Sequence, residues 1–87
     1  MLLKILLPAE VLLTQEVKKI IAEAENGSFC LMPNHIDFVA TLAPGIFTYE
    51  PAQGGQELLA MDVGTLVKKG SNVLVSTRNA VLSLIHI

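Results

Sequence analysis

The segment Glu16–Met32, with the sequence EVKKIIAEAENGSFCLM, contains the strongest local fold signal in the chain. An Asn26-Gly27 dipeptide lies between two apolar runs, and this is the pattern most typical of a tight β-hairpin turn. In the returning half, Phe29 and Leu31 are two residues apart, so they share one face of a strand. Glu, Lys and Ala before the turn also favour a helix. The turn and the returning run together nevertheless predict that Glu16–Met32 is a β-hairpin.

The same alternation of apolar runs and turn residues continues on both sides of this hairpin. Short aliphatic and β-branched runs are separated by Gly, Pro, Asn and Ser at intervals of roughly eight to twelve residues, which is typical of a small sandwich or barrel. The sequence therefore predicts an all-β fold, a small β-sandwich, and leaves residues 35–42 without a firm assignment. The strands expected outside the hairpin are Leu2–Leu7, Val11–Leu13, Ile46–Glu50, Glu57–Val63, Thr65–Lys68 and Asn72–Thr77.

The length of the chain, 87 residues, allows a single domain. We expect the sandwich to span residues 1–79. Residues 80–87 form an apolar tail without acidic or strongly basic side chains. This tail is either a last edge strand, which as an uncharged apolar edge would carry an aggregation risk, or the truncated start of a missing C-terminal region.

Composition excludes several classes of protein. The formal net charge is −2 and only 16% of the residues are charged, whereas nucleic-acid binding needs clustered basic side chains. The pairs Lys18-Lys19 and Lys68-Lys69 are more typical of solvated side chains. The single cysteine, Cys30, excludes an intrachain disulfide, and no apolar run is long enough to cross a bilayer. The hydrophobic content of 52% indicates either a core that is unusually dense in Leu, Ile and Val or apolar surface that belongs to a partner, and we favour a mixture of both.

No constellation of residues in the sequence points to chemistry. Cys30 and His35 are close, but no third group is clearly placed to orient the histidine for nucleophilic catalysis. Asp37 and His86 together with His35 fall short of any zinc spacing. Nucleotide-binding glycine motifs are absent. The sequence therefore predicts no catalytic residue, no metal site and no cofactor.

One segment, Val67–Leu74, resembles the late hairpin of biotinyl or lipoyl carrier domains. Those domains carry their cofactor on a lysine at a hairpin tip, and the comparable residues here, Ala60-Met61-Asp62-Val63, contain none. A carrier domain, or another all-β interaction module, remains the alternative function.

Segments that follow one another along nearly the whole chain, from about Leu2 to Ala80, resemble the epsilon subunit of F-type ATP synthases. Its acidic-Gly stretch that ends in Pro-x-His is similar to Glu25–His35, although Cys30 and Asn34 stand where glycines are usual and residues 36–39 replace an Ala-Pro. At these positions and at residues 76–80, the sequence is more similar to the epsilon subunits of the sodium-linked type of F-type ATPase. The other matching segments are Glu16–Ile20, Thr41–Ile46, Leu59–Val67 and Asn72–Thr77.

The resemblance implies a non-catalytic rotor subunit of the central stalk, folded as a small flattened β-sandwich of about ten short strands. Such a subunit couples ion-driven rotation of the c-ring to the gamma subunit, and so to ATP synthesis or hydrolysis. By position, the hairpin tip is expected to contact the c-ring through Glu25, Asn26, Gly27 and Ser28. The segment after it is expected to contact gamma through His35, Phe38 and Val39.

The resemblance also implies where the protein is located and which part of the family's structure is missing from this sequence. The protein would be peripheral, on the cytoplasmic face of the inner (plasma) membrane, without a transmembrane segment of its own. The translocated ion, proton or sodium, is left open. The family carries a C-terminal helical hairpin that would begin near Ala80, and it is absent from these 87 residues.

Overall fold

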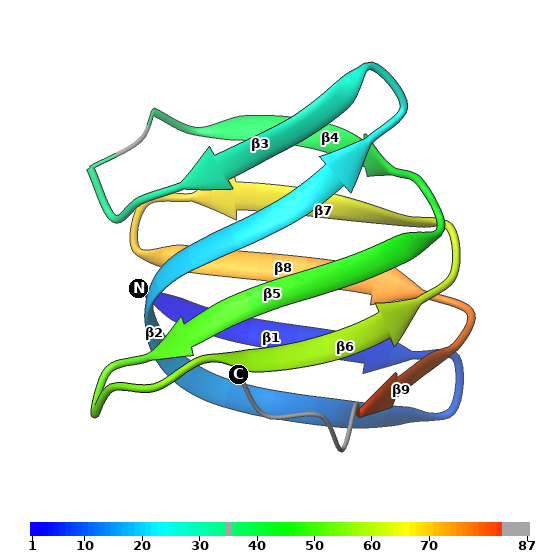
Figure 1. Ribbon diagram of the computed structural model, residues 1–87, viewed down its shortest axis with the longest axis horizontal. Coiled ribbons are helices and arrows are strands. Elements are labelled where there is room, and N and C mark those ends of the chain that lie inside the picture. The colour runs from blue at the N-terminus through cyan, green and yellow to red at the C-terminus, as the bar shows by residue number, and fades with distance from the viewer. Residues whose placement is uncertain (35, 83–87) are drawn as a thin grey trace.

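The computed structural model describes residues 1–34 and 36–82, and every regular element in that part of the chain is a β-strand (Figure 1). The all-β expectation is confirmed. The strands of the described residues are β1 (Leu2–Leu7), β2 (Glu10–Ala24), β3 (Gly27–Leu31), β4 (Phe38–Leu42), β5 (Gly45–Pro51), β6 (Glu57–Met61), β7 (Gly64–Lys69), β8 (Asn72–Thr77) and β9 (Ala80–Leu82).

The strands form two packed layers that share β2, a strand of 15 residues (Figure 1). The first half of β2 pairs antiparallel with β1, from Leu7↔Glu10 to Leu2↔Glu16, and its second half pairs with β3 and β5. One layer has the order β1-β8-β7-β4 and the other has the order β3-β2-β5-β6-β9. β2 therefore closes one side of the sandwich by passing from one layer to the other.

The length of β2 corrects one sequence prediction. We expected separate strands at Val11–Leu13 and from Glu16 onward, with a break at the polar residues between them. Thr14 and Gln15 instead continue the ladder opposite Lys4 and Leu3 of β1. The break is absent because Thr14 is exposed and Gln15 only half-buried, so both polar side chains still reach water while the backbone ladder continues.

The hairpin predicted for Glu16–Met32 is confirmed as the β2–β3 pair, with Ala24 opposite Gly27. Gly27 has a φ of +126°, a conformation that a residue with a Cβ rarely adopts. Elsewhere, β4 lies in the unassigned segment, β5 runs on to Pro51, and β6 ends at Met61 before the expected Val63.

The core lies between the layers and follows the strict alternation of the strands. On β8, for example, Val73 and Val75 are buried whereas Leu74 between them is exposed. Burying one such aliphatic side chain contributes about 1.5–3 kcal/mol. The buried hydrophobic residues are Leu3, Ile5, Val17, Ile20, Ala22, Leu31, Leu42, Phe47, Tyr49, Leu59, Met61, Leu66, Val73, Val75 and Ala80.

Lys68 contradicts the expectation that both lysines of its pair are solvated. Adjacent residues of a strand face opposite sides, so Lys69 is exposed whereas Lys68 points inward and is only 2% exposed. Its Nζ donates a hydrogen bond to the carbonyl oxygen of Gly70, at 2.8 Å, in the β7–β8 turn. The lysine therefore lies at the end of the sandwich, where its charged group reaches a turn carbonyl.

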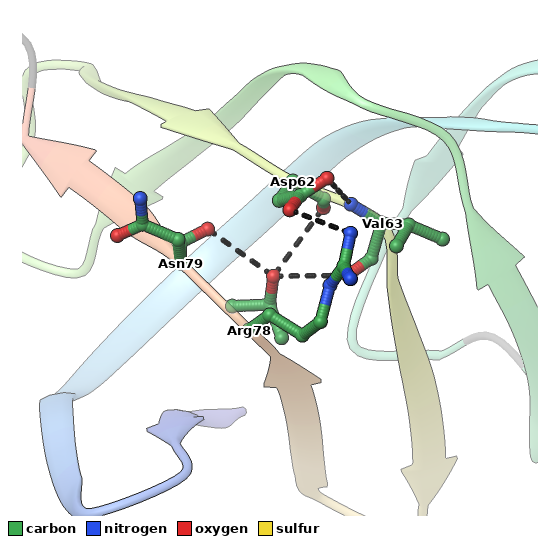
Figure 2. A network of polar contacts seen from close by, with 5 residues as sticks. Asp62, Val63, Arg78 and Asn79 are labelled. Atoms are coloured by element: carbon green, nitrogen blue, oxygen red, sulfur yellow. Dashed lines mark hydrogen bonds and ion pairs between the residues drawn. The ribbon is translucent and has the colours of Figure 1, made fainter.

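A polar network connects the β6–β7 turn to the β8–β9 turn (Figure 2). The buried hydroxyl of Thr77 lies 3.1 to 3.3 Å from the carbonyl oxygens of Asp62, Val63 and Asn79. The backbone N–H of Asp62 donates to Asn79, and the Asp62 carboxylate accepts from Arg78 at 3.0 Å. These contacts hold the corner at which the chain crosses from β8 to β9 in the other layer.

The tail that the sequence separates from the sandwich begins with β9. Its residues Ala80–Leu82 pair antiparallel with β6, and Ala80 is buried. The rest of the tail, residues 83–87, lies outside the described residues. No helix among the described residues is long and apolar enough to cross a membrane.

Candidate partner-binding surfaces

The tip of the β2–β3 hairpin is an exposed polar surface. All four residues that the sequence assigns to a c-ring contact, Glu25, Asn26, Gly27 and Ser28, are exposed and lie together at this turn. Glu23, at the end of β2, is exposed as well. This end of the hairpin therefore presents two exposed carboxylates, which suits contact with a polar or basic surface.

The residues assigned to a gamma contact do not share one face. Phe38 and Val39 are neighbours on β4, so they point to opposite sides of the layer. Phe38 is half-buried and packs edge-on against Phe29 of β3, with ring centroids 5.4 Å apart. Val39 is 67% exposed on the outer side. His35 lies outside the described residues.

The exposed Val39 belongs to an apolar row that crosses the outer face of the β1-β8-β7-β4 layer. The registers place Val39 opposite Val67 of β7, and Val67 opposite Leu74 of β8. Val67 and Leu74 are 36% and 39% exposed, large fractions for aliphatic side chains in the middle of strands. We call Val39, Val67 and Leu74 the apolar row.

Sequence reasoning missed Val67 and Leu74 as surface residues. Both lie in segments predicted as strands, and each is one residue from a core position, Leu66 or Val73. Period-two alternation could have indicated that they face outward. It could not show that they lie side by side, because that depends on the pairing register.

The charged residues within the four strands around the apolar row are all basic, although the exposed Asp37 lies just before β4. None of the four strands of this layer contains an acidic residue, whereas Lys4 pairs with Leu74 and the exposed Lys69 lies two residues from Val67. At one end of the face is a hollow of about 540 Å³, lined in part by Leu6, Ser76 and Arg78. The layer thus offers an apolar strip flanked by positive charge.

The sites that could carry chemistry remain isolated in the described residues. Cys30 is an exposed thiol on β3, and Asp37 accepts a hydrogen bond from the Gly70 N–H through Oδ1 at 2.8 Å. His35 and His86 lie outside the described residues. Among those that are described, no three His, Cys, Asp or Glu side chains are grouped so that they could hold a metal ion.

The comparisons with known proteins point to one family. A family model described as the β-sandwich domain of the ATP synthase delta/epsilon chain matches residues 1–83. Among curated proteins, the ATP synthase epsilon chain of Dichelobacter nodosus is 31% identical over 68 residues, which are 78% of this chain and 48% of that protein. Epsilon chain 2 of Paraburkholderia xenovorans is 30% identical over 77 residues, 86% of this chain and 55% of that protein. The chain thus spans about half the length of these curated relatives.

Solved structures show the same fold. A chain of the Euglena gracilis mitochondrial ATP synthase, in a structure of OSCP, F1 and the c-ring, superposes with a TM-score of 0.86 at 27% identity, covering 92% of this chain and 51% of that one. A chain of the Tetrahymena thermophila mitochondrial ATP synthase, from the central stalk and c-ring, has a TM-score of 0.77 at 11% identity and covers 92% of this chain and 64% of that one. At that identity the second match shows the fold alone.

Proposed function

Since the chain belongs to the family of ATP synthase delta/epsilon β-sandwich domains, we propose that it is a non-catalytic subunit of the central stalk that couples rotation of the c-ring to the gamma subunit. The observation that carries this proposal is the match of the family model to residues 1–83 of an all-β chain. The chemistry of ATP synthesis or hydrolysis then belongs to other subunits, and this chain has a mechanical role.

Two surfaces of the sandwich suit the two partners. For gamma we propose the apolar row with the flanking Lys4 and Lys69, because permanent interfaces combine an apolar centre with a charged rim. Val39 is part of this surface, His35 would lie in the same segment, and Phe38 would act from beneath by packing on Phe29. For the c-ring we propose the hairpin tip.

The first experiment tests the gamma surface. Val67→Asp places a charge in the centre of the apolar row, where a bound partner would exclude water. We expect the affinity for the gamma subunit, measured by calorimetric titration, to fall at least about tenfold, or 1.4 kcal/mol.

The matched control is Ile46→Asp. Ile46 is also a β-branched strand residue and is 47% exposed, but it lies on the outer face of the other layer. Its substitution should leave the affinity within about twofold, since it lies away from the proposed interface. Equal losses for the two variants would contradict the assignment of the gamma surface, and no binding by the unmodified folded chain would contradict the stalk role.

The hairpin tip can be tested by cross-linking in the assembled complex. Cys30 is exposed and only two residues from the tip, so a Cys30→Ser background is needed before Asn26→Cys is introduced. We expect the new thiol to cross-link to the c-ring and to block rotation-coupled ATP hydrolysis until the link is reduced. Cross-links to other subunits alone would contradict the tip assignment.

The location and the translocated ion follow the same proposal. A stalk subunit of this kind lies peripherally on the cytoplasmic face of the plasma membrane, held there by the complex. The resemblance of residues 36–39 and 76–80 is to the sodium-linked type, and the translocated ion, proton or sodium, stays open. The dependence of ATPase activity on sodium in the reconstituted complex distinguishes the two.

The carrier-domain alternative is not favoured. The family match is to a different domain, and the β6–β7 connection between Met61 and Gly64 contains no lysine to modify. An unchanged intact mass after expression with biotinyl and lipoyl ligases would exclude it.

A further inference from the structure

β2 joins the two layers through its pairs with β1 along one side, whereas on the other side β3 and β4 are not paired with each other in the described residues. β4 pairs with β7 along its whole length, from Phe38↔Lys68 to Leu42↔Gly64. With β2 it forms a single pair, Ala24↔Leu42, and β3 pairs only with β2. Most of one edge of β4 therefore meets no other strand in the described part of the chain.

The direction of the backbone groups on this edge follows from one hydrogen bond. The N–H of Ala43 donates to the carbonyl oxygen of Glu23 on β2, at 2.9 Å, so Ala43 faces away from β7. In an antiparallel ladder, the residues that bond to one neighbour alternate with those that bond to the other. Thr41 and Val39 therefore direct backbone groups toward the open side, where an added strand could pair with them.

A groove of about 510 Å³ runs along this edge. Phe38, Val39, Ala40 and Thr41 line one side of it, and the other side is formed by the hairpin tip together with Phe29. The Phe29–Phe38 ring pair is only half-buried. The groove thus offers a backbone edge and apolar side chains that a short extended segment would cover.

The sequence of β4 lacks the features by which natural proteins protect an edge strand. Such edges usually carry Lys, another charge, Pro or a bulge that prevents pairing with a second chain. β4 reads Phe-Val-Ala-Thr-Leu, without charge or Pro, and its ladder with β7 is regular. An unprotected edge beside a groove is the arrangement used for recognition by strand addition.

From these observations we infer that the groove binds an extended segment of a partner protein, which adds as a strand to the open edge of β4. The segment alternates apolar or β-branched residues facing the Phe29–Phe38 pair with polar residues facing outward. It carries a Lys or Arg at the end beside Glu25, because Glu25 is the one charged residue among the described residues that line the groove. This inference does not depend on the role in the stalk.

The test is a titration of the ¹⁵N-labelled full chain with a defined probe. The probe is an acetylated and amidated six-residue peptide of alternating valine and threonine with one terminal arginine. We expect chemical-shift changes at the amides of residues 38–42 and 25–29, and at least tenfold slower hydrogen exchange of the Val39 and Thr41 amides at saturation. Shift changes confined to other strands, or none, would overturn the inference.

Backbone pairing is separated from simple apolar contact by a modified probe. N-methylation of alternate residues removes the hydrogen-bond donors of one edge of the peptide and leaves its side chains unchanged. We expect the peptide that is methylated on the edge facing β4 to lose binding, and we expect the same of a peptide with a central proline. If these peptides bind as tightly as the unmodified probe, strand addition is overturned. This comparison uses the unmodified chain, so it does not depend on the folding of a variant.

Variants of the chain test the same edge. Val39→Pro removes the N–H directed into the groove, and Val39→Thr keeps it with a side chain of similar shape, so binding should be lost in the first and retained in the second. Glu25→Gln should weaken the arginine peptide about two- to fivefold, the range of an exposed ion pair, and leave a neutral peptide unaffected. Concentration-dependent dimerisation through the β4 edge without any peptide would assign the groove to a second copy and overturn the inference.

Discussion

Gly64, the first residue of β7, lies where the backbone of β8 comes closest. A Cβ at this position would overlap with the carbonyl oxygen of Ser76 and lie 3.1 Å from the Cβ of Thr77. Both are parts of the paired neighbouring strand, so neither can move without disturbing the ladder. We expect Gly64→Ala to lower the free energy of unfolding by about 1–3 kcal/mol, measured by urea titration followed by circular dichroism.

Gly45 provides the matched control. It also opens a strand, β5, but the nearest atom to an added Cβ is Oε2 of Glu23, at 3.1 Å, at the end of an exposed and flexible side chain. Gly45→Ala should change the free energy of unfolding by less than about 0.5 kcal/mol, because that carboxylate can turn away. Equal losses in the two variants would show that the Ser76 contact is not the cause.

Tyr49 gives the chain a predictable sensitivity to high pH. Burial, and then the negative charge of Glu57 opposite it on β6, raise the pKa of its hydroxyl above the ordinary 10.0. Above pH 10 the unfolded chain therefore releases this proton before the folded chain does. It follows that the free energy of unfolding falls as the pH rises from 10 to the folded pKa, and below pH 10 Tyr49 contributes no slope.

Tyr49→Phe should remove that part of the pH dependence. Lysines also titrate in this range, so the informative quantity is the difference between the two chains in the free energy of unfolding at pH 8 and at pH 10.5. Tyr49 is the single tyrosine of the chain and tryptophan is absent, so tyrosinate absorbance reports its ionisation directly. Parallel pH profiles for the two chains would contradict the raised pKa.

At the scale of the elements, Thr77 is the residue that holds two turns together. Thr77→Val keeps the shape of the side chain and removes the hydroxyl that three carbonyl oxygens surround. We expect the free energy of unfolding to fall by about 1–2 kcal/mol, since buried acceptors lose their donor. Hydrogen exchange should accelerate first at the Asp62 N–H, which donates to Asn79 across the same corner.

The Arg78–Asp62 ion pair belongs to the same corner but should contribute much less. The Arg78 side chain is 74% exposed, so water screens the pair. Arg78→Gln is therefore a useful companion to Thr77→Val, with an expected loss below about 0.5 kcal/mol. A loss as large as that of Thr77→Val would place the stability of the corner in the ion pair instead.

The elements also show which parts of the fold can be predicted from the sequence. Strand β8 has the predicted bounds, because its apolar residues alternate strictly and Gly70-Ser71 and Arg78-Asn79 flank it. β5 extends one residue further than predicted, to Pro51, which has no N–H to donate but ends the strand opposite Val17 at a register irregularity. Local patterns thus indicate strands and turns, whereas the continuity of β2 depends on its distant partner β1.

At the scale of the whole molecule, the candidate surfaces could be predicted only in part. The hairpin tip was visible in the sequence because a turn is local. The apolar row and the groove along β4 were not, because they are created by pairings between residues far apart, such as Val39↔Val67 and Ala24↔Leu42. The same pairings bring the tip and residues 38–41 to one groove, although the resemblance assigns them to different partners.

The boundary of the sandwich leads to the last prediction, for a chain that ends at Asn79. Such a chain keeps the Thr77 network, which reaches only as far as the Asn79 carbonyl. It loses the buried Ala80 and the three pairs of β9 with β6, so that Leu59 and Met61 of the core lie on an open edge. We expect the free energy of unfolding to fall by about 1–3 kcal/mol, and light scattering to show association, since β6 then presents an unpaired edge.

Val81→Thr in the full chain is the control, because Val81 is 60% exposed and its substitution keeps the pairing intact. If instead the shortened chain is as stable and as monomeric as the full one, the sandwich is complete at residue 79, as the sequence alone suggests.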